Sequence, residues 1–213
     1  MGNSTSNHDD YYATFQIEYN TNGKIDKVLV SHSHRVDKPA NFDFDIRNTE
    51  NLEIYEYNYS NNRLASITRE SGEIEEEFLY DNRGRVNKHR YFDAHYPSWI
   101  EYDYTYDSEG KLDTYIYKKV STGESRYGSF DSDNKVNPFY NFWVENSFIM
   151  PSDFTYIMDF NLSFYPHNIT AIYEANEKWY GVHIEYEGDY PLIYDVDDSP
   201  SFTRAPTRFT YVN

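Results

Sequence analysis

Apolar and polar residues alternate along many short segments of this chain. In residues 100–106 every second residue, from Ile100 to Tyr106, is aliphatic or aromatic, and the residues between them are acidic or Thr. Residues 13–19 and 54–59 alternate in the same way. Because successive side chains of a strand point to opposite faces, this pattern predicts antiparallel strands with one buried and one solvated face.

A second pattern links these segments: an aromatic residue, a few turn residues ending in Gly or Asn, a Lys or Arg, and an aliphatic residue. Five copies begin at Tyr19, Tyr59, Tyr80, Tyr106 and Phe130, and two degenerate copies begin at Tyr165 and Tyr186. Most spacings suit two strands of ordinary length with their turns. Gly, Asn and Asp tolerate the positive φ values of tight turns, so the repeat predicts consecutive hairpins. We expect the basic residue to be a solvated edge residue.

In several copies two aliphatic residues lie three positions apart, as at Ile25 and Val28 or Leu64 and Ile67. An odd spacing puts the two side chains on opposite faces unless a β-bulge intervenes. A bulge near the turn and a strand covered on both faces are the two alternatives.

The repeat pattern is interrupted after Asn137. An N-cap residue, Pro138 and a helical spacing of aromatic residues predict a short helix or compact loop over about 138–147, ending before Pro151, whose aromatic side chains plug the sheet.

These elements predict an all-β fold: a single large, strongly curved antiparallel sheet, or a soluble barrel of consecutive hairpins, with one short helix or loop insertion. Tyr along whole strands, opposite a face of Glu, Asp, Thr and Lys, favours the soluble forms over a membrane barrel. Residues 1–10 are polar and are expected to be a flexible tether left after signal removal, and residues 11–213 to form a single β-hairpin-repeat domain.

Composition changes the picture in two ways. The 213 residues include 24 Tyr and 14 Phe, which indicates an aromatic core in a sheet with one solvated face rather than a core built from layers of Leu. The net charge of −17 argues against nucleic acid or an anionic membrane surface as a partner, and the absence of Cys excludes disulfides and thiolate chemistry.

Polar clusters that could carry chemistry are few. His32 and His34 share a strand face, but no third zinc ligand can be assigned, and we expect no metal site. The run Glu75 to Glu77 is expected to be a solvated face; if instead Glu75 and Glu77 faced a cleft, they could serve a glycan hydrolase. Asp195, Asp197 and Asp198 are expected to form an Asp-rich turn. With none of the common catalytic or cofactor motifs present, we expect no catalytic residues and no cofactor.

Aromatic residues are the remaining candidates for binding. If exposed, the three tryptophans could form a stacking platform for sugar rings, and the predicted ligand-binding residues are Trp99, Trp143, Trp179 and Phe139.

The copies Tyr80-Asp-Asn-Arg-Gly84-Arg85-Val86 and Tyr106-Asp-Ser-Glu-Gly110-Lys111-Leu112 resemble YD (Rhs-type) repeats. Farther on, Asn137-Pro138-Phe139, His167-Asn168-Ile169-Thr170, Tyr190-Pro191 and Phe209-Thr-Tyr211 follow in an order that resembles a Bacteroidetes secreted lipoprotein family of unknown function with a porin-like β fold. The resemblance implies a lipidated N-terminal anchor and a periplasmic or cell-surface location, as an outer-membrane lipoprotein.

The sequence therefore favours a non-catalytic cell-envelope protein that binds a glycan or an envelope protein through Tyr and Trp surfaces, and that meets a membrane only through its lipid anchor. A glycan hydrolase with paired carboxylates and a structural or assembly subunit remain as alternatives.

Overall fold

The computed structural model describes residues 11–34, 52–93, 97–137, 140, 164–197 and 207–208. Thirteen strands occupy these ranges. They are β1 (Tyr11–Tyr19), β2 (Ile25–His34), β3 (Leu52–Ser60), β4 (Arg63–Arg69), β5 (Ile74–Tyr80), β6 (Val86–Asp93), β7 (Ser98–Tyr106), β8 (Leu112–Lys119), β9 (Glu124–Val136), β10 (His167–Glu174), β11 (Glu177–Glu187), β12 (Tyr190–Asp197) and β13 (Thr207–Arg208).

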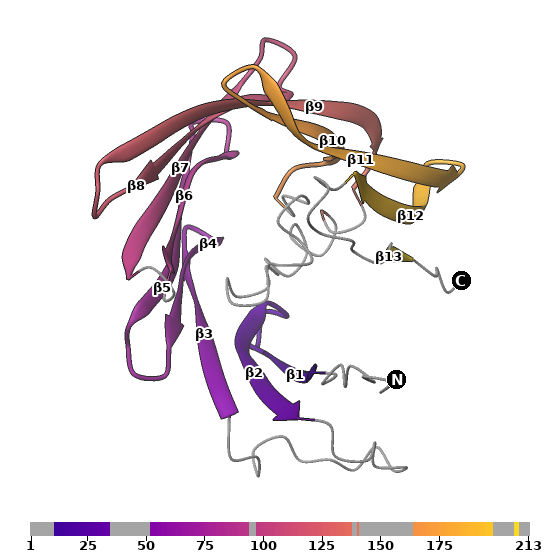
Figure 1. Ribbon diagram of the computed structural model, residues 1–213. Coiled ribbons are helices and arrows are strands. Elements are labelled where there is room, and N and C mark those ends of the chain that lie inside the picture. Colours follow the sequence, from indigo (N-terminus) through magenta and orange to yellow (C-terminus); the bar gives the residue numbers. More distant parts are fainter. Residues whose placement is uncertain are drawn as a thin grey trace, which may run out of the picture.

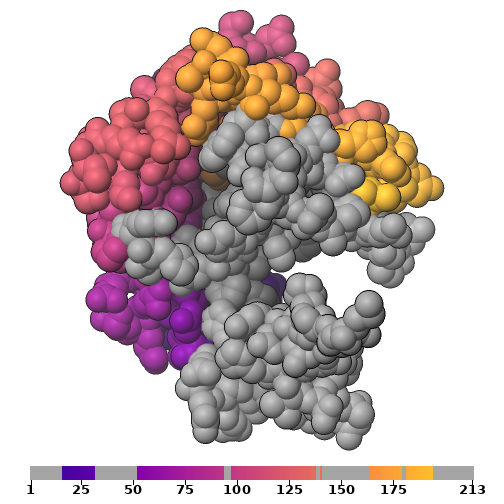
Figure 2. Space-filling model, viewed as in Figure 1, coloured from indigo at the N-terminus to yellow at the C-terminus, as the bar shows by residue number. Residues whose placement is uncertain are grey.

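All thirteen strands belong to one antiparallel sheet, and each strand pairs with its neighbours in the sequence. The sheet curves strongly, with β1 and β13 at its two ends (Figure 1). In the space-filling view the middle strands form a continuous arc (Figure 2). The predicted all-β fold is confirmed, and of its two forms the structure has the curved sheet, because the strands described do not close into a barrel.

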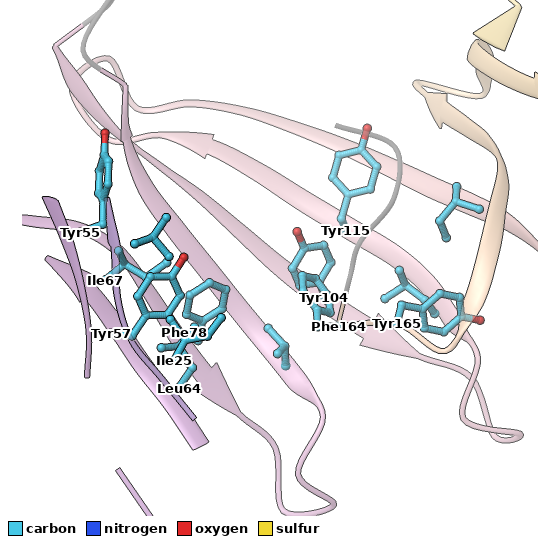
Figure 3. Packing of buried hydrophobic residues seen from close by; sticks show 14 of the residues in the cluster. Ile25, Tyr55, Tyr57, Leu64, Ile67, Phe78, Tyr104, Tyr115, Phe164 and Tyr165 are labelled. Carbon is cyan, nitrogen blue, oxygen red and sulfur yellow. The ribbon is translucent and has the colours of Figure 1, made fainter. Parts of the chain in front are cut away.

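One face of the sheet, here called the inner face, carries the hydrophobic core. Its residues extend from Ile25 and Val28 on β2 to Ile169 and Ile172 on β10. Figure 3 shows these side chains in two groups: an aliphatic and aromatic group around Tyr57 and Ile67, and an aromatic group around Tyr104. The predicted alternation is confirmed here, since Tyr55, Tyr57, Ile100 and Tyr104 are all buried.

The opposite, outer face is largely polar. Cross-strand neighbours there form ion pairs and hydrogen bonds, such as Lys27 with Glu56 at 2.7 Å and Thr105 with Thr114 at 2.6 Å. Such pairs stabilise a solvated sheet face modestly and leave it compatible with water.

The repeat motif forms a structure that we call the turn ladder. Tyr59, Tyr80 and Tyr106 each donate a hydrogen bond to the carbonyl oxygen of the aliphatic residue in the preceding copy, namely Ile25, Leu64 and Val86, at 2.7–2.9 Å. Each ring also lies under the basic residue of that copy. Lys24, Arg63 and Arg85 are 4.9, 5.3 and 4.0 Å from the respective ring centroids.

The expectation that the basic residues are merely solvated is therefore wrong for these three copies. A cation over a Tyr face contributes about 0.5–1 kcal/mol, and the Tyr hydroxyl satisfies a carbonyl next to the turn. The Tyr and the basic residue recur together because each copy supplies one half of a contact with the next copy.

A bulge in the hairpin of each of the first four repeat copies explains the odd aliphatic spacing. The register shifts next to the turn, between Glu18 and Tyr19 in β1 and between Asn58 and Tyr59 in β3, and again at the corresponding places in β5 and β7. Because the bulge inserts one extra residue between them, Ile25 and Val28 both point to the inner face, where at most 1 % of either side chain is exposed. Of the two alternatives, the bulge is confirmed.

The copy at Phe130 does not form a hairpin turn, because β9 continues through it to Val136. Asp133, at the centre of the predicted turn, accepts hydrogen bonds from the backbone of Lys135 and from Tyr186 on β11. The copy at Tyr186 is a hairpin as predicted, with Gly188 at φ +64° between β11 and β12. Apart from Tyr140, the helix or loop predicted over 138–147 lies outside the described residues.

Within the described ranges no helix has the length and apolar character needed to cross a bilayer. The tether predicted over residues 1–10 lies outside the described residues, and β1 begins at Tyr11 as expected.

Candidate binding site

The acidic run of β5 is not a solvated face. Glu76 is 1 % exposed and Glu75 is 6 % exposed, so the expectation from the sequence is wrong for both. A bulge causes the difference for Glu75: Ile67 pairs with Glu76 and Thr68 with Ile74, which leaves Glu75 as the extra residue. Glu76 lies two residues before the buried Phe78 and faces inward by the regular alternation of the strand.

The bulge also changes which carboxylates share a face. Glu75 binds Arg69, whose guanidinium lies 5.7 Å from the ring of the buried Tyr55, on the inner face. Glu77 binds Arg90 on the outer face. A hydrolase that used Glu75 and Glu77 as its carboxylate pair would need both on one face, and β5 does not place them so.

Glu76 lies on the inner face with His89 of β6 as its hydrogen-bond partner. The Glu76 Oε2 to His89 Nε2 distance is 2.9 Å. The imidazole stacks on Phe78, with ring centroids 4.7 Å apart and planes inclined by 6°. Glu76 Oε1 is buried and has no hydrogen-bond partner among the residues that the structure describes. We call these two residues the Glu76–His89 pair.

A comparison of the repeat copies is the signal that finds this pair. Four positions before the repeat tyrosine, the copies that start at Tyr19, Tyr59 and Tyr106 have Phe15, Tyr55 and Tyr102, and the copy at Tyr80 has Glu76. Three positions after the aliphatic residue, these copies have Val28, Ile67 and Tyr115, and the same exceptional copy has His89. Both departures from the apolar pattern fall in one copy, and the fold places them in hydrogen-bond contact.

Next to the pair, three half-buried tyrosines cross the inner face. Tyr91 pairs with Glu76 across β5 and β6, and its ring lies 5.8 Å from that of His89. Tyr102 lies 6.4 Å from Tyr91, and Tyr117 lies 5.6 Å from Tyr102. We call Tyr91, Tyr102 and Tyr117 the tyrosine strip.

Charged residues end the strip at β9. The guanidinium of Arg126 lies 5.6 Å from the Tyr117 ring and binds Glu124 at 2.6 Å and Glu174 at 3.5 Å. Glu174 also accepts a hydrogen bond from Tyr115 at 3.3 Å. The strip thus extends from a buried acid–imidazole pair to a cluster of the exposed Arg126 and Glu124 with the half-buried Glu174.

The buried tyrosines beside the pair keep their protons. Burial, reinforced by the Glu76 carboxylate, raises the pKa of Tyr57 well above its usual value. Burial, with smaller contributions from Tyr106 and other neighbours, does the same for Tyr104. The phenols near the pair are therefore neutral groups that can donate hydrogen bonds.

Trp99 is the tryptophan whose side chain the structure describes, and it does not lie at this site. Trp99 lies on the outer face, where it packs edge-on against Phe92 at 5.9 Å and under Arg90 at 4.7 Å. The backbone of Trp179 lies in β11, but its side chain is outside what the structure describes, as are Trp143 and Phe139 entirely. The ligand-binding role of these four residues stays a prediction.

The histidine and aspartate motifs are not tested as metal sites, because the side chains of His32, His34, Asp195 and Asp197 are outside what the structure describes. In the part of the chain that the structure describes, no three His, Asp or Glu side chains come together to hold a metal ion. His32 and His34 are in β2 and Asp195 and Asp197 are in β12, so the Asp-rich segment is strand up to Asp197 rather than a turn.

Comparison with known proteins identifies no family. No protein-family model matches the chain, and no curated protein matches it. Among solved structures it is similar to a porin-like protein from Bacteroides uniformis ATCC 8492, at 11 % identity, over 90 % of this chain and 85 % of that chain, with a TM-score of 0.43. A likeness of this degree carries no argument about function.

Proposed function

We propose that this protein is a non-catalytic binding protein of the cell envelope, and that the tyrosine strip on its inner face binds a glycan. The observation that carries this proposal is the row of half-buried Tyr91, Tyr102 and Tyr117, which ends at the exposed Arg126. Tyr rings offer flat apolar faces to the C–H side of a sugar, while their hydroxyl groups and the flanking charges provide hydrogen bonds.

The pairing of the acids favours binding over hydrolysis. A glycosidase of the usual kind needs two carboxyl groups on either side of one glycosidic bond, one as acid and one as base or nucleophile. Here Glu75 is bound to Arg69, Glu76 to His89, and Glu124 and Glu174 to Arg126. These partners suit fixed recognition groups.

The envelope location is supported by the ordered motifs between Asn137 and Tyr211, which resemble those of a secreted lipoprotein family. Fractionation of the native host tests it. Recovery of the protein with membranes or in the periplasm is expected, and recovery in the cytosol would contradict the location.

A glycan array followed by calorimetry tests the binding. Tyr117→Ala is expected to weaken the binding of any glycan found by up to about tenfold, because one aromatic stacking contact contributes about 0.5–1.5 kcal/mol. Tyr127→Ala is the matched control, since Tyr127 is an exposed tyrosine on the outer face of the adjacent strand. Equal effects of the two substitutions, or no glycan bound, would overturn the proposal.

The same array tests the surface predicted from the sequence. Trp99→Ala, Trp143→Ala, Trp179→Ala and Phe139→Ala are scored beside Tyr117→Ala. Loss of binding in these variants, with Tyr117→Ala unaffected, would move the glycan site away from the strip.

A further inference from the structure

The Glu76–His89 pair is costly where it stands, and the apolar pattern of the other copies does not require it. A carboxylate removed from water loses strong hydration, and an oxygen that finds no donor adds a further cost. Phe15, Tyr55 and Tyr102 show that the same position in other copies takes an aromatic residue. A polar pair at a position that folding fills with apolar side chains indicates a role in recognition.

The unpartnered oxygen defines the chemistry of the missing group. Glu76 Oε2 is engaged by His89, while Oε1 is buried and receives no hydrogen bond from the described part of the chain. An ionised carboxylate accepts hydrogen bonds only, so the complementary group is an O–H or N–H donor. A ligand carboxylate or phosphate at this place would face like charge.

The strip connects the pair with partly exposed surface. The His89 side chain is 13 % exposed, against 2 % for Glu76, and the half-buried Tyr91 lies beside both. Tyr91 then leads to Tyr102 and Tyr117. A sugar ring stacked at the Tyr91 end of the strip would bring its substituents to Glu76.

We propose that the Glu76–His89 pair is the specificity-determining site of the inner face, and that Glu76 Oε1 accepts a hydrogen bond from a hydroxyl or ammonium group of a neutral or amino sugar and rejects uronic acids. His89 is a positioning residue, which holds the carboxylate through Oε2 and is itself held by Phe78. This inference rests on the proposed function, because it names the sugar class that the strip would take.

The test compares three oligosaccharides of one ring skeleton: glucose, glucosamine and glucuronate oligomers. Calorimetry in 0.5 M salt screens the long-range repulsion by a chain of net charge −17 and leaves short-range contacts. We expect the glucuronate oligomer to bind at least about tenfold more weakly than the better of the other two, because like charges meet at Glu76.

Glu76→Gln removes the charge and keeps the shape, and is expected to narrow this preference to within about threefold. Glu56→Gln is the matched control, because it removes the same charge from the outer face and is expected to leave the preference unchanged. Circular dichroism and the unfolding midpoint establish that both variants are folded.

The outcomes separate the two proposals. If no glycan binds, the proposed function fails and this inference fails with it. If glycans bind and Tyr117→Ala weakens them, but the wild type does not discriminate against glucuronate, only this inference is overturned, whether or not Glu76→Gln folds. Discrimination that persists in Glu76→Gln would likewise overturn it and leave Oε1 with an internal water as partner.

Discussion

The tyrosines of the turn ladder and the inner-face residues four positions before them lie on the same strands, about 13 Å apart. We call the second set the mid-strand positions. The residue type is constant in the ladder and changes between repeat copies at the mid-strand positions. In the ladder Tyr59, Tyr80 and Tyr106 make the same two contacts from copy to copy. Four residues earlier on these strands, the side chain is Tyr55, Glu76 or Tyr102.

This difference has a physical origin. A ladder contact joins two copies, so a change in one residue leaves a carbonyl or a ring of the neighbouring copy without its partner. A mid-strand side chain faces the interior, where many shapes can pack if their neighbours adjust. The ladder fixes the register of the hairpins, and the mid-strand positions are available for binding.

The largest expected effect comes from separating the Glu76–His89 pair. His89→Leu is expected to lower the free energy of unfolding by about 3 kcal/mol, because it leaves a buried carboxyl without its partner. Glu76→Met with His89→Leu is expected to recover wild-type stability or exceed it, because the inner face then becomes apolar as in the other copies. Urea unfolding followed by circular dichroism measures both. Equal losses in the single and double variants would show that the pair is not the coupled unit described here.

Tyr115 is larger than the aliphatic residues at the same position in other copies, and its packing can be tested. Its ring occupies the place of Val28 and Ile67 in other copies because Gly128 lies opposite it on β9. A Cβ at Gly128 would overlap the Tyr115 ring and the carbonyl oxygen of Tyr173. Gly128→Ala is therefore expected to cost about 2 kcal/mol in urea unfolding.

Ser125→Ala is the control for this experiment, because Ser125 is exposed on the same strand. It should change stability by less than about 0.5 kcal/mol. If Gly128→Ala is equally mild, the inner face has more room around Tyr115 than the contacts indicate.

The ladder is tested by removing single hydroxyl groups. Tyr80→Phe and Tyr106→Phe are each expected to lower the free energy of unfolding by about 1 kcal/mol, because the carbonyl oxygens of Leu64 and Val86 lose a donor. Tyr127→Phe on the exposed outer face should have almost no effect. A ladder variant as stable as the wild type would mean that the rings, and not the hydrogen bonds, hold adjacent copies together.

The smallest expected effect is on the stability of the protein at acidic pH. Burial opposes ionisation of Asp81, but hydrogen bonds from the backbone and guanidinium of Arg85 outweigh it, and the pKa of Asp81 lies below its usual value. A lowered folded-state pKa contributes stability above the unfolded value of about 4, and this contribution is lost as the pH falls through the folded-state value. Asp81→Asn should flatten the fall in unfolding free energy between about pH 5 and pH 2. An unchanged slope would contradict this role.

Much of the fold could be predicted because its signals are local. The alternation from Ile100 to Tyr106 and the Gly and Asn turns predict hairpins without knowledge of distant residues. The prediction of a turn in the copy at Phe130 was wrong for a non-local reason: Asp133 accepts a hydrogen bond from Tyr186, which lies 53 residues away along the chain.

The candidate site was harder to predict, although its two polar residues stand out when the copies are aligned. Period-two alternation places Glu75 and Glu77 on one face, and only the bulge of β5 against β4 turns Glu75 to the inner face beside Glu76. Similarly, nothing local in Lys24, Arg63 or Arg85 indicates the tyrosine ring of the next copy.

The sequence by itself determined the aromatic inner face, most of the hairpins and the positions of their turns, because backbone conformation and side-chain alternation depend on neighbouring residues. The tertiary structure decided that the sheet stays open, which residues the bulges turn inward, and that Glu76 and His89 meet. Those outcomes depend on strand register and on contacts between copies, and they come into existence only when separate hairpins pack into one curved sheet.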